Sequence, residues 1–541
     1  MEHHDAAPMD CDYLIIGSGF GGSVSALRLV EKGYRVIVVE KGRRFRPADF
    51  PKSNWNLKRW LWMPAVGFRG LFKMTFLRHI TALSGVGYGG GSLVYANTLP
   101  IPNDDFFSSP SWASLADWQG ELAPHYQTAL RMLGAAKNPY TTFPDQVLKR
   151  VGESIGRGEH FDSTRVAVYF GEPGVTVKDP YFDGAGPERT GCTQCGACMI
   201  GCRHGAKNTL DKNYLHLAER GGLEAHTDAE VRLVRPLDGG GYAVEALVGE
   251  RFWRRKKRTF RAQNVIFSGG VLGTVPLLLK LKERADALPR LSAALGRFVR
   301  TNSEVLMGVV SQKRDVDMSH GVAISSILHT DEHSHLEPVR YPKGSGFFRT
   351  LSMPHAPGDN VFARVFNASW YGLRHPIRTL RAGFVWDWAK NTMILLYMRT
   401  LDGHLSVRLG RSFRTGFRRG LVTDLADGPA PTASIPEATA LAHAVAKEID
   451  GTPQSLVTET LLGIPTTAHI LGGCCMGANG ETGVIDHRHR VFGYDGLFVI
   501  DGSAMSANPG VNPSLTITAL AERAMSFIPP KEERGAVSHG P

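Results

Sequence analysis

The chain has 541 residues, of which 43% are hydrophobic and 21% charged, as in an ordinary folded globular protein. Its length favours two domains over one simple core. Lysine and arginine outnumber aspartate and glutamate by 62 to 51, a net charge of +11, but no nucleic-acid-binding motif accompanies this excess, so we expect no nucleic-acid partner.

The sequence also limits the cellular context. No stretch reaches about 18 uncharged apolar residues, which excludes a membrane-spanning helix. Residues 1–10 contain neither an apolar signal region nor a twin-arginine pair. Seven cysteines, four of them crowded together, do not resemble a secreted disulfide framework. We therefore expect a cytoplasmic protein with no visible export signal, and peripheral contact with an anionic membrane stays open.

A glycine-rich turn at residues 17–22 follows the first apolar run. An amphipathic stretch and a second apolar run, which ends at Glu40, complete one β–α–β unit. Gly17 permits the tight turn, Gly19 lets the backbone approach a pyrophosphate, and Gly22 allows the helix to pack on the strand. Glu40 stands where a ribose hydroxyl binds, which disfavours a phosphorylated nicotinamide cofactor and leaves FAD and NAD.

Residues 54–80 interleave aromatic and apolar side chains with cations. This mixture is typical of a segment that lies on a membrane interface or lines an apolar entrance. It is equally typical of the edge of a core with snorkelling cations. On the first interpretation, Trp60 and Trp62 would contribute to docking on lipid and to entry of an apolar substrate.

A second glycine-rich segment spans residues 84–97, with five glycines between positions 85 and 91. Such a density of glycine disfavours both a helix and a central strand. It suits a backbone that presses against a flat ligand and donates N–H groups to it.

A cysteine run follows, formed by Cys192, Cys195, Cys198 and Cys202. Its spacing matches the bacterial ferredoxin run for an iron–sulfur cluster, except that Arg203 replaces the usual proline. In ferredoxins the fourth cysteine serves a second cluster, and this chain contains no second run. We therefore expect buried or redox-sensitive thiols and no metal.

The rest of the chain alternates between strand and helix patterns. A helix is expected near residues 122–133 and another at 274–280. Strands are expected at residues 224–227, 231–234, 242–248 and 264–270. Residues 300–410 carry no glycine fingerprint and are rich in aromatic side chains, which indicates a second domain.

The C-terminal region has its own motifs. His469 precedes a pair of glycines, and a buried strand at 497–500 ends in Asp501. Pro513 occupies the first position of a helix expected to run through Phe527, so the positive end of that helix faces the group that Asn512 contacts.

With these motifs in order, the sequence resembles the glucose-methanol-choline (GMC) flavoprotein oxidoreductases, and within them the cholesterol oxidase branch. The likeness is carried by the turn at 17–22 and by residues 85–97, 209–215, 469–477 and 510–513. It implies an α/β (α+β overall) protein with a discontinuous Rossmann-like FAD-binding domain and a sheet-based substrate-binding domain. The expected FAD-binding domain comprises residues 1–100, 215–300 and 465–541, and the substrate-binding domain comprises residues 101–214 and 301–464 with helical and lid segments.

Three residues are expected to carry the chemistry. His469 suits proton abstraction from a hydroxyl because an imidazole titrates near neutrality, and Asn512 can donate to the substrate oxygen without changing charge. The resemblance adds Glu337 as the base of a double-bond isomerisation; an exposed or ion-paired carboxylate is the alternative. The expected cofactor-binding residues are Gly17, Gly19, Phe20, Gly21, Gly22, Glu40, Gly85, Gly90, Ser92, Asn97, Val231, Gly269, Asp501, Gly502, Asn512 and Pro513.

The resemblance implies FAD-dependent oxidation of a 3β-hydroxysterol to its ketone, with oxygen reduced to hydrogen peroxide, followed by a Δ5 to Δ4 isomerisation. One alternative is a flavin dehydrogenase that passes electrons from another bulky apolar alcohol to a carrier other than oxygen. Another is a redox sensor at a membrane that uses the cysteine run as its switch.

Overall fold

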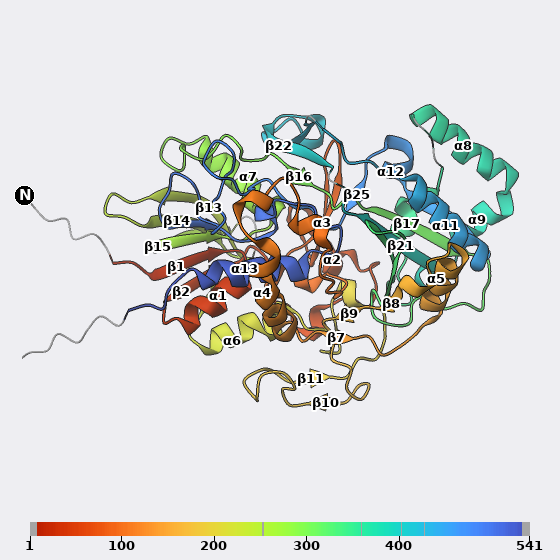
Figure 1. Cartoon of the computed structure of the whole chain (residues 1–541), viewed down its shortest axis with the longest axis horizontal. Helices are drawn as coiled ribbons and strands as arrows, with labels where there is room; N and C mark the ends of the chain where they lie inside the picture. Colours follow the sequence, from red (N-terminus) through yellow and green to blue (C-terminus); the bar gives the residue numbers. More distant parts are fainter. Residues whose placement is uncertain are drawn as a thin grey trace, which may run out of the picture.

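The computed structural model describes residues 8–250, 254–356, 358, 360–401, 403–426 and 428–532. The expectation that no export signal precedes the first strand depends mainly on residues 1–7, which lie outside these ranges. Two large sheets stand side by side, one built from the ends and middle of the chain and the other from its centre (Figure 1).

The first sheet is centred on β1, the strand before the first glycine turn. Its strand order is β12-β2-β1-β15-β14-β13, with β26 added beside β15. The pairs β12–β2, β2–β1, β1–β15 and β15–β26 are parallel, and the β15–β14–β13 meander is antiparallel. The strand bounds are β1 Cys11–Ile16, β2 Val36–Val39, β12 Glu224–His226, β13 Ala229–Pro236, β14 Tyr242–Val248, β15 Lys256–Phe267 and β26 Leu497–Val499.

Four helices pack below this sheet (Figure 1). They are α1 (Phe20–Glu31), α4 (Trp118–Met132), α6 (Tyr214–Arg220) and α13 (Ser514–Ser526). Apolar side chains of these helices and of the parallel strands form one continuous buried core. Residues 13–16 of β1, all of β2 and residues 265–267 of β15 are apolar, because helices cover one face and the meander and α7 (Val271–Lys282) shield the other side.

The second sheet is antiparallel throughout, in the order β20-β24-β17-β21-β19-β18-β8. Helices α5 (Phe143–Ser154) and α11 (Pro436–Glu448) cover one face and share a buried cluster with β17 and β21. The strand bounds are β8 Phe161–Ser163, β17 Val305–Ser311, β18 Ser326–His329, β19 Ser334–Val339, β20 Ser352–Pro354, β21 Thr392–Arg399 and β24 Gly451–Leu456.

Smaller units connect the two sheets. One is a three-stranded sheet of β5 (Phe72–Phe76), β6 (Thr81–Gly85) and β25 (Thr466–Thr467). A second three-stranded sheet contains β16 (Val299–Arg300), β22 (His404–Gly410) and β23 (Gly420–Leu425). Among the described residues, no helix has the length and apolarity needed to cross a bilayer.

Residues 54–80 run along the edge of a core that encloses Trp60, which corrects the membrane-facing interpretation for Trp60. The Trp60 ring is fully buried and stacks on Phe72 with ring centroids 4.7 Å apart. Phe347 and Phe348 meet the same ring edge-on, at 5.2 and 5.8 Å. The core-edge alternative therefore describes Trp60, because this ring packs on side chains almost 300 positions away, whereas Trp55, Met63, Val66 and Phe76 of the same segment are exposed.

Candidate active site

Residues from both large sheets line one cavity of about 550 Å³. The expected site residues that line it are Gly17, Gly19, Phe20, Gly21, Glu40, Gly85, Gly90, Val231, Gly269, His469, Asp501, Gly502, Asn512 and Pro513. Four expected residues, Gly22, Ser92, Asn97 and Glu337, are buried near the cavity but do not line it.

The two glycine-rich segments meet at one end of the cavity. A Cβ atom on Gly90 would lie 2.6 Å from the Cα atom of Gly19, so the two backbones touch. Gly17 has φ +102°, and a Cβ there would lie 2.4 Å from the Ser268 carbonyl oxygen. A Cβ on Gly22 would lie 2.1 Å from the Gly17 carbonyl oxygen, so Gly22 serves helix packing. At Gly19, by contrast, the Cβ direction meets only Ser268, at 3.9 Å, which leaves its backbone accessible from the cavity.

Glu40 follows β2 and is held by the first glycine turn. Its Oε2 accepts from the Ser18 backbone N at 3.1 Å and from Ser18 Oγ at 2.8 Å, and its Oε1 accepts from the Gly42 N at 2.8 Å. These bonds orient a carboxylate that lines the cavity. An oriented acceptor at this position suits the ribose hydroxyls of a dinucleotide.

Asp501 connects two segments of the cavity wall by hydrogen bonds. Its Oδ2 accepts from the Gly270 N and from Thr274 Oγ1, at 2.8 and 2.6 Å. Its Oδ1 accepts from the Ser503 N and from Ser503 Oγ, at 2.8 and 2.5 Å. Burial raises the pKa of this carboxyl above its usual value. Asp501 thus joins the end of β26 to the start of α7, and Gly502 presents backbone to the cavity.

Ser92 has a structural contact where cofactor binding was expected. Its Oγ donates to the Gly89 carbonyl at 2.7 Å and accepts from the Leu210 N at 3.0 Å, which ties the second glycine segment to residues 209–215. Asn97 is buried with φ +68°, so it also shapes the turn that ends this segment.

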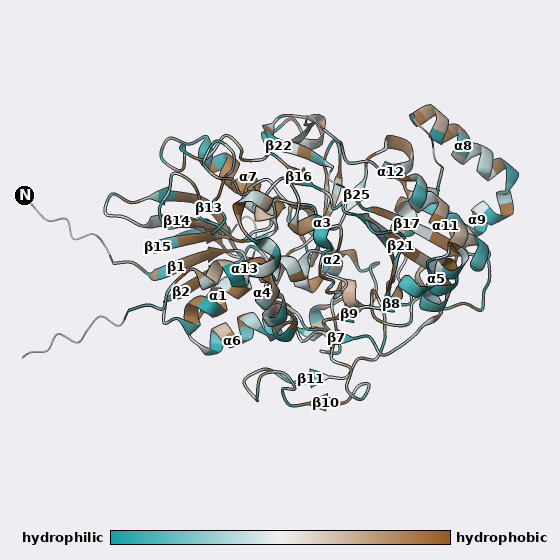
Figure 2. Ribbon diagram, in the orientation of Figure 1, coloured by the Kyte–Doolittle hydropathy of each residue, from teal (hydrophilic) through white to brown (hydrophobic). Residues whose placement is uncertain are grey.

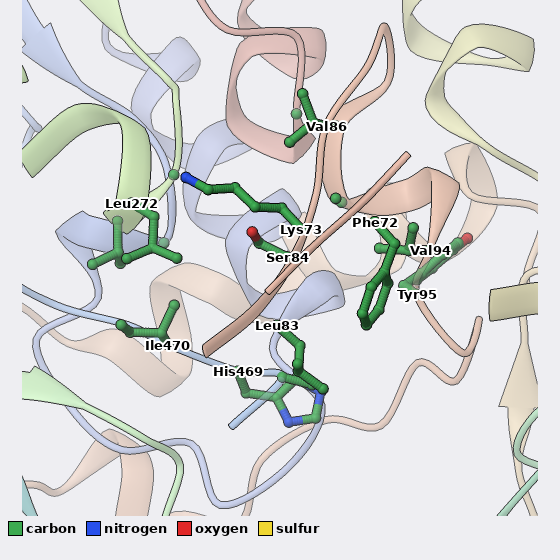
Figure 3. A pocket seen from close by; sticks show the side chains of 18 of the residues that line it. Phe72, Lys73, Leu83, Ser84, Val86, Val94, Tyr95, Leu272, His469 and Ile470 are labelled. Carbon is green, nitrogen blue, oxygen red and sulfur yellow. The ribbon is translucent and has the colours of Figure 1, made fainter. Parts of the chain in front are cut away.

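His469 is oriented by a carboxylate that sequence reasoning missed. Its Nδ1 lies 2.6 Å from Oε2 of Glu304, and the other oxygen of Glu304 accepts from the backbone N of Ala468 and of His469, at 2.5 and 3.2 Å. The Glu304 side chain is fully buried. Because a carboxylate accepts hydrogen bonds, this contact assigns the ring proton to Nδ1 and leaves Nε2 as the acceptor of a ring that lines the cavity (Figure 3).

The backbone before Glu304 is strained. Asn302 and Ser303 are consecutive non-glycine residues with φ +62° and +46°. Nδ2 of Asn302 donates to the Val511 carbonyl at 3.0 Å, next to Asn512. Such strain persists only when the surroundings impose it, and here it brings Glu304 to His469 and ties the 511–512 turn to the same place. A polar Thr-Asn-Ser-Glu run at the start of a strand is the only sequence signal that could have indicated it.

Asn512 contacts Glu337. With its amide turned so that nitrogen faces Glu337, Nδ2 lies 3.0 Å from Oε1 and 3.2 Å from Oε2. Glu337 is fully buried on β19, and burial raises its pKa to about 8, with the charge of Glu304 acting in the same direction. His335 cannot offset a charge on Glu337, because burial lowers its own pKa to about 3 and keeps the ring neutral.

Strand alternation aims Glu337 toward the cavity. Side chains two residues apart on a strand share a face, so Glu337 shares a face with Val339, which lines the cavity. Asn512 lines the cavity and lies within hydrogen-bond distance of Glu337. The two residues therefore form one polar pair, with Asn512 at the cavity surface.

The wall from the second sheet and its neighbouring loops is mainly apolar. Its apolar lining side chains include Leu306, Met307, Ile324, Val339, Tyr341, Phe348, Ile394 and Leu396, and its polar ones are Ser352, Thr392, Gln454 and Ser455. With His469 and Asn512 as the neighbouring polar groups, this arrangement suits a large hydrocarbon that carries one hydroxyl group.

The cavity also has polar groups that fit a dinucleotide. Ser514 Oγ and Thr98 Oγ1 are buried on the lining without a partner among the described residues, although buried hydroxyls normally have one. Lys73, which sequence reasoning missed, extends within the cavity (Figure 3), and burial together with the charge of Lys41 lowers its pKa to about 8. With the glycine backbones and the N-terminus of α13, these groups fit FAD.

The cysteine run packs beside the cavity. Cys192, Cys198 and Cys202 belong to one buried cluster, and Met199 of the run lines the cavity. Lys207 Nζ donates to the carbonyls of Cys198, Leu93 and Tyr95 at 2.8, 3.1 and 2.9 Å, which fastens the run to the second glycine segment. In the described part of the chain, no three His, Cys, Asp or Glu side chains are arranged to hold a metal ion.

Comparisons with known proteins agree with this geometry. Two family models described as GMC oxidoreductase match residues 186–281 and 421–521, and one described as an FAD binding domain matches residues 12–50. A cholesterol oxidase of Acinetobacter baumannii is 46% identical over 96% of this chain and 95% of its own length. A cholesterol oxidase of Mycobacterium tuberculosis is 45% identical over 97% of this chain and 92% of its own length.

One solved structure shows the same fold at lower identity. The crystal structure of pyridoxine 4-oxidase from Mesorbium loti superposes with a TM-score of 0.60 at 16% identity. The match covers 96% of this chain and 99% of that one, so the similarity extends over both large sheets.

Proposed function

The chain belongs to the GMC oxidoreductase family, in the branch of the cholesterol oxidases, and from this premise we propose that it oxidises 3β-hydroxysterols such as cholesterol to the 3-ketone, with oxygen as the electron acceptor. The enzyme is an FAD-dependent alcohol oxidoreductase. The observation that carries the sterol proposal is the mainly apolar wall of the cavity, which also contains the polar side chains of His469 and Asn512. A fused-ring hydrocarbon with one hydroxyl group matches that distribution of polarity.

The residues that would hold FAD are those of the two glycine segments, Glu40, Lys73 and the N-terminus of α13. When bound, FAD accepts a hydride from the alcohol carbon and passes the electrons on to oxygen, which yields hydrogen peroxide. The α13 N-terminus places partial positive charge beside the cavity, where it favours negative charge on a bound group.

His469 removes the hydroxyl proton in this proposal. Its Nε2 has no partner among the described residues, and Glu304 keeps the proton on Nδ1. As the carbon loses hydride, the hydroxyl proton passes to Nε2, and the Glu304 carboxylate stabilises the imidazolium that forms. Asn512 Nδ2 has two hydrogens, so it can donate to Glu337 and to the substrate oxygen at the same time.

Glu337 carries the proposed isomerisation. The base must take a proton from the carbon between the new ketone and the double bond, and return it at the far end of the shifting double bond. A buried carboxyl with a pKa of about 8 suits both halves of this transfer, since its two protonation states are similar in energy near neutral pH. The proposal that Glu337 reaches the cavity is supported by its position on β19, two residues before Val339, whose side chain lies on the same face of the strand and lines the cavity.

The oxidation is tested by anaerobic addition of cholesterol to the purified holoenzyme. We expect the flavin absorbance to bleach, and oxygen uptake with peroxide release after air is admitted. Bleaching by the sterol without oxygen uptake, but with rapid reduction of a dye, would instead identify a dehydrogenase. An unchanged spectrum with sterol would contradict the proposal.

The isomerisation is tested with Glu337→Gln, which keeps the size of the side chain but cannot accept a proton. We expect this variant to oxidise sterol and to release the unconjugated 5-en-3-one, which lacks the strong ultraviolet absorbance of the conjugated 4-en-3-one. In the wild type, isomerisation should rise with pH up to about 8 and level off above it, because only the deprotonated carboxylate is a base. Conjugated product from Glu337→Gln at the wild-type rate would move the base elsewhere.

A further inference from the structure

Helices α8 (Val361–Arg374) and α9 (Pro376–Phe384) form a hairpin that projects from the end of the second sheet (Figure 1). The hairpin alternates hydrophobic and hydrophilic residues (Figure 2), and eight of its apolar side chains, counting Trp386 just after α9, are exposed to solvent. They are Phe362, Phe366, Trp370, Leu373, Ile377, Leu380, Phe384 and Trp386, with exposures of 86, 65, 47, 74, 66, 59, 80 and 100%.

The spacing of these residues places them on one stripe of each helix. On α8 the positions 362, 366, 370 and 373 recur every three or four residues, and on α9 the positions 377, 380 and 384 do the same. The buried positions of the two helices are the small residues Ala368 and Ala382. An amphipathic helix normally buries its apolar stripe, so the outward stripe here is a face that lacks its partner.

The charge of the hairpin indicates what that partner is. Residues 360–386 contain four arginines and no aspartate or glutamate, and one of the arginines, Arg378, pairs with Asp450. Arg374 lies over the Trp370 ring at 4.8 Å, and Arg381 is exposed. Aromatic, aliphatic and arginine side chains on one helical surface are typical of helices that lie in the interface of a bilayer containing anionic lipid.

The hairpin is anchored to the cavity wall. α8 packs on β20 and α12 (Val457–Leu462), and α9 packs on β24. Arg364 fixes α8 by donating from Nε to the Thr460 carbonyl at 2.8 Å. Strands β20 and β24 carry Ser352 and residues 454–456, which line the cavity. A surface that binds this hairpin would therefore lie close to the part of the cavity wall that the second sheet forms.

We propose that the α8–α9 hairpin, with Trp386, docks the enzyme on anionic lipid bilayers. Its apolar stripe would enter the boundary between headgroups and acyl chains while its arginines meet lipid phosphates. A second copy of the chain fits less well, because a two-fold contact through this stripe would bring Arg374 and Arg381 of both copies together. The proposal places the membrane contact at the hairpin and not at residues 54–80, whose Trp60 is buried. The idea that the docked enzyme takes up a sterol dissolved in the membrane rests on the proposed function. The docking itself does not depend on that function.

The test is flotation of holoenzyme with phosphatidylcholine vesicles that contain or lack phosphatidylserine. We expect binding to the anionic vesicles that weakens with salt. The variant Phe362→Ser/Phe366→Ser/Phe384→Ser should reduce binding at least tenfold, and Arg374→Gln/Arg381→Gln should reduce it about fivefold per arginine and lessen the salt dependence. Retained flavin absorbance and an unchanged melting temperature show that the variants are folded.

The matched control is Phe413→Ser/Phe417→Ser, which removes two rings of similar exposure, 84 and 68%, beside other arginines near the β22–β23 turn. Binding should be unchanged in this control. Wild-type protein that stays unbound, equal losses in control and hairpin variants, or a wild-type dimer that the hairpin variant dissociates would each overturn the proposal.

The same variants separate docking from chemistry. Hairpin variants should oxidise sterol delivered in cyclodextrin at the wild-type rate and oxidise sterol held in anionic vesicles more slowly. If the enzyme does not oxidise sterol in either form, the proposed function fails while flotation still decides docking.

Discussion

At the scale of single residues, the proposed proton transfer depends on the contact between His469 and Glu304. The 2.6 Å contact from Nδ1 to Glu304 sets the tautomer, and the two backbone N–H groups on the other carboxylate oxygen hold Glu304 in place. A neutral histidine without this partner could carry its proton on either ring nitrogen. Its Nε2 would then be unprotonated, and able to accept a proton from the substrate, for only part of the time.

We predict that Glu304→Gln slows flavin reduction by substrate about 10²- to 10⁴-fold, because a neutral amide neither fixes the tautomer nor stabilises the imidazolium. As a positioning residue, Glu304 should affect kcat far more than KM, and Glu304→Asp should restore part of the rate. Rapid-mixing absorbance measures the step. Glu283→Gln, which alters an exposed carboxylate paired with Arg419, is the control and should react normally. A Glu304→Gln enzyme with the wild-type rate would exclude the assignment.

At the scale of elements, the cofactor end of the cavity depends on two loops that approach each other without side chains. Gly19 begins α1 as its N-cap, and Gly90 begins a short 3₁₀ turn, Gly90–Leu93, with φ +53°. The second loop could not come as close to the first with a Cβ on Gly90.

We predict that Gly90→Ala weakens FAD retention, because its Cβ would lie 2.6 Å from the Gly19 Cα and would force the two loops apart. The fraction of FAD retained after gel filtration measures the effect. Gly240→Ala provides the control: its φ of +87° carries the same kind of backbone strain, but nothing lies within 4 Å of the added Cβ. Equal FAD content in the two variants would show that the approach of the loops does not matter.

At the scale of the whole molecule, the two ends of the chain close one domain. Arg28 on α1 donates from Nε and Nη2 to Glu522 on α13, at 2.7 and 2.8 Å, and the Tyr214 hydroxyl donates to the same carboxylate at 2.6 Å. The first sheet's helical layer therefore cannot form until nearly the whole chain is present.

We predict that Glu522→Ala lowers the free energy of unfolding by about 2–4 kcal/mol, since it leaves a largely buried Arg28 and the Tyr214 hydroxyl without their acceptor. Urea unfolding followed by fluorescence measures the loss. Glu31→Ala removes the other partner of Arg28, an exposed one at 2.6 Å, and should cost at most about 0.5 kcal/mol. Similar losses in both variants would mean that burial of the Arg28–Glu522 pair contributes nothing.

Local sequence determined the nucleotide-binding half of the site. The glycine turn, the acid after β2 and the proline before α13 are short-range patterns, and each acts through backbone geometry within a few residues. Helical periodicity elsewhere in the chain is equally local, and it placed two helices nearly where they occur: α4 spans Trp118–Met132 against an expected 122–133, and α7 begins three residues before the expected Thr274.

Only the tertiary structure decided which distant groups meet. Glu304 is separated from His469 by 165 positions and Glu337 from Asn512 by a similar span, so no local pattern connects them. The same reason explains residues 54–80 and the α8–α9 hairpin. Both mix aromatic and cationic side chains, and composition cannot tell a segment that finds a core partner, as Trp60 does in Phe72, from one whose apolar stripe is left facing solvent.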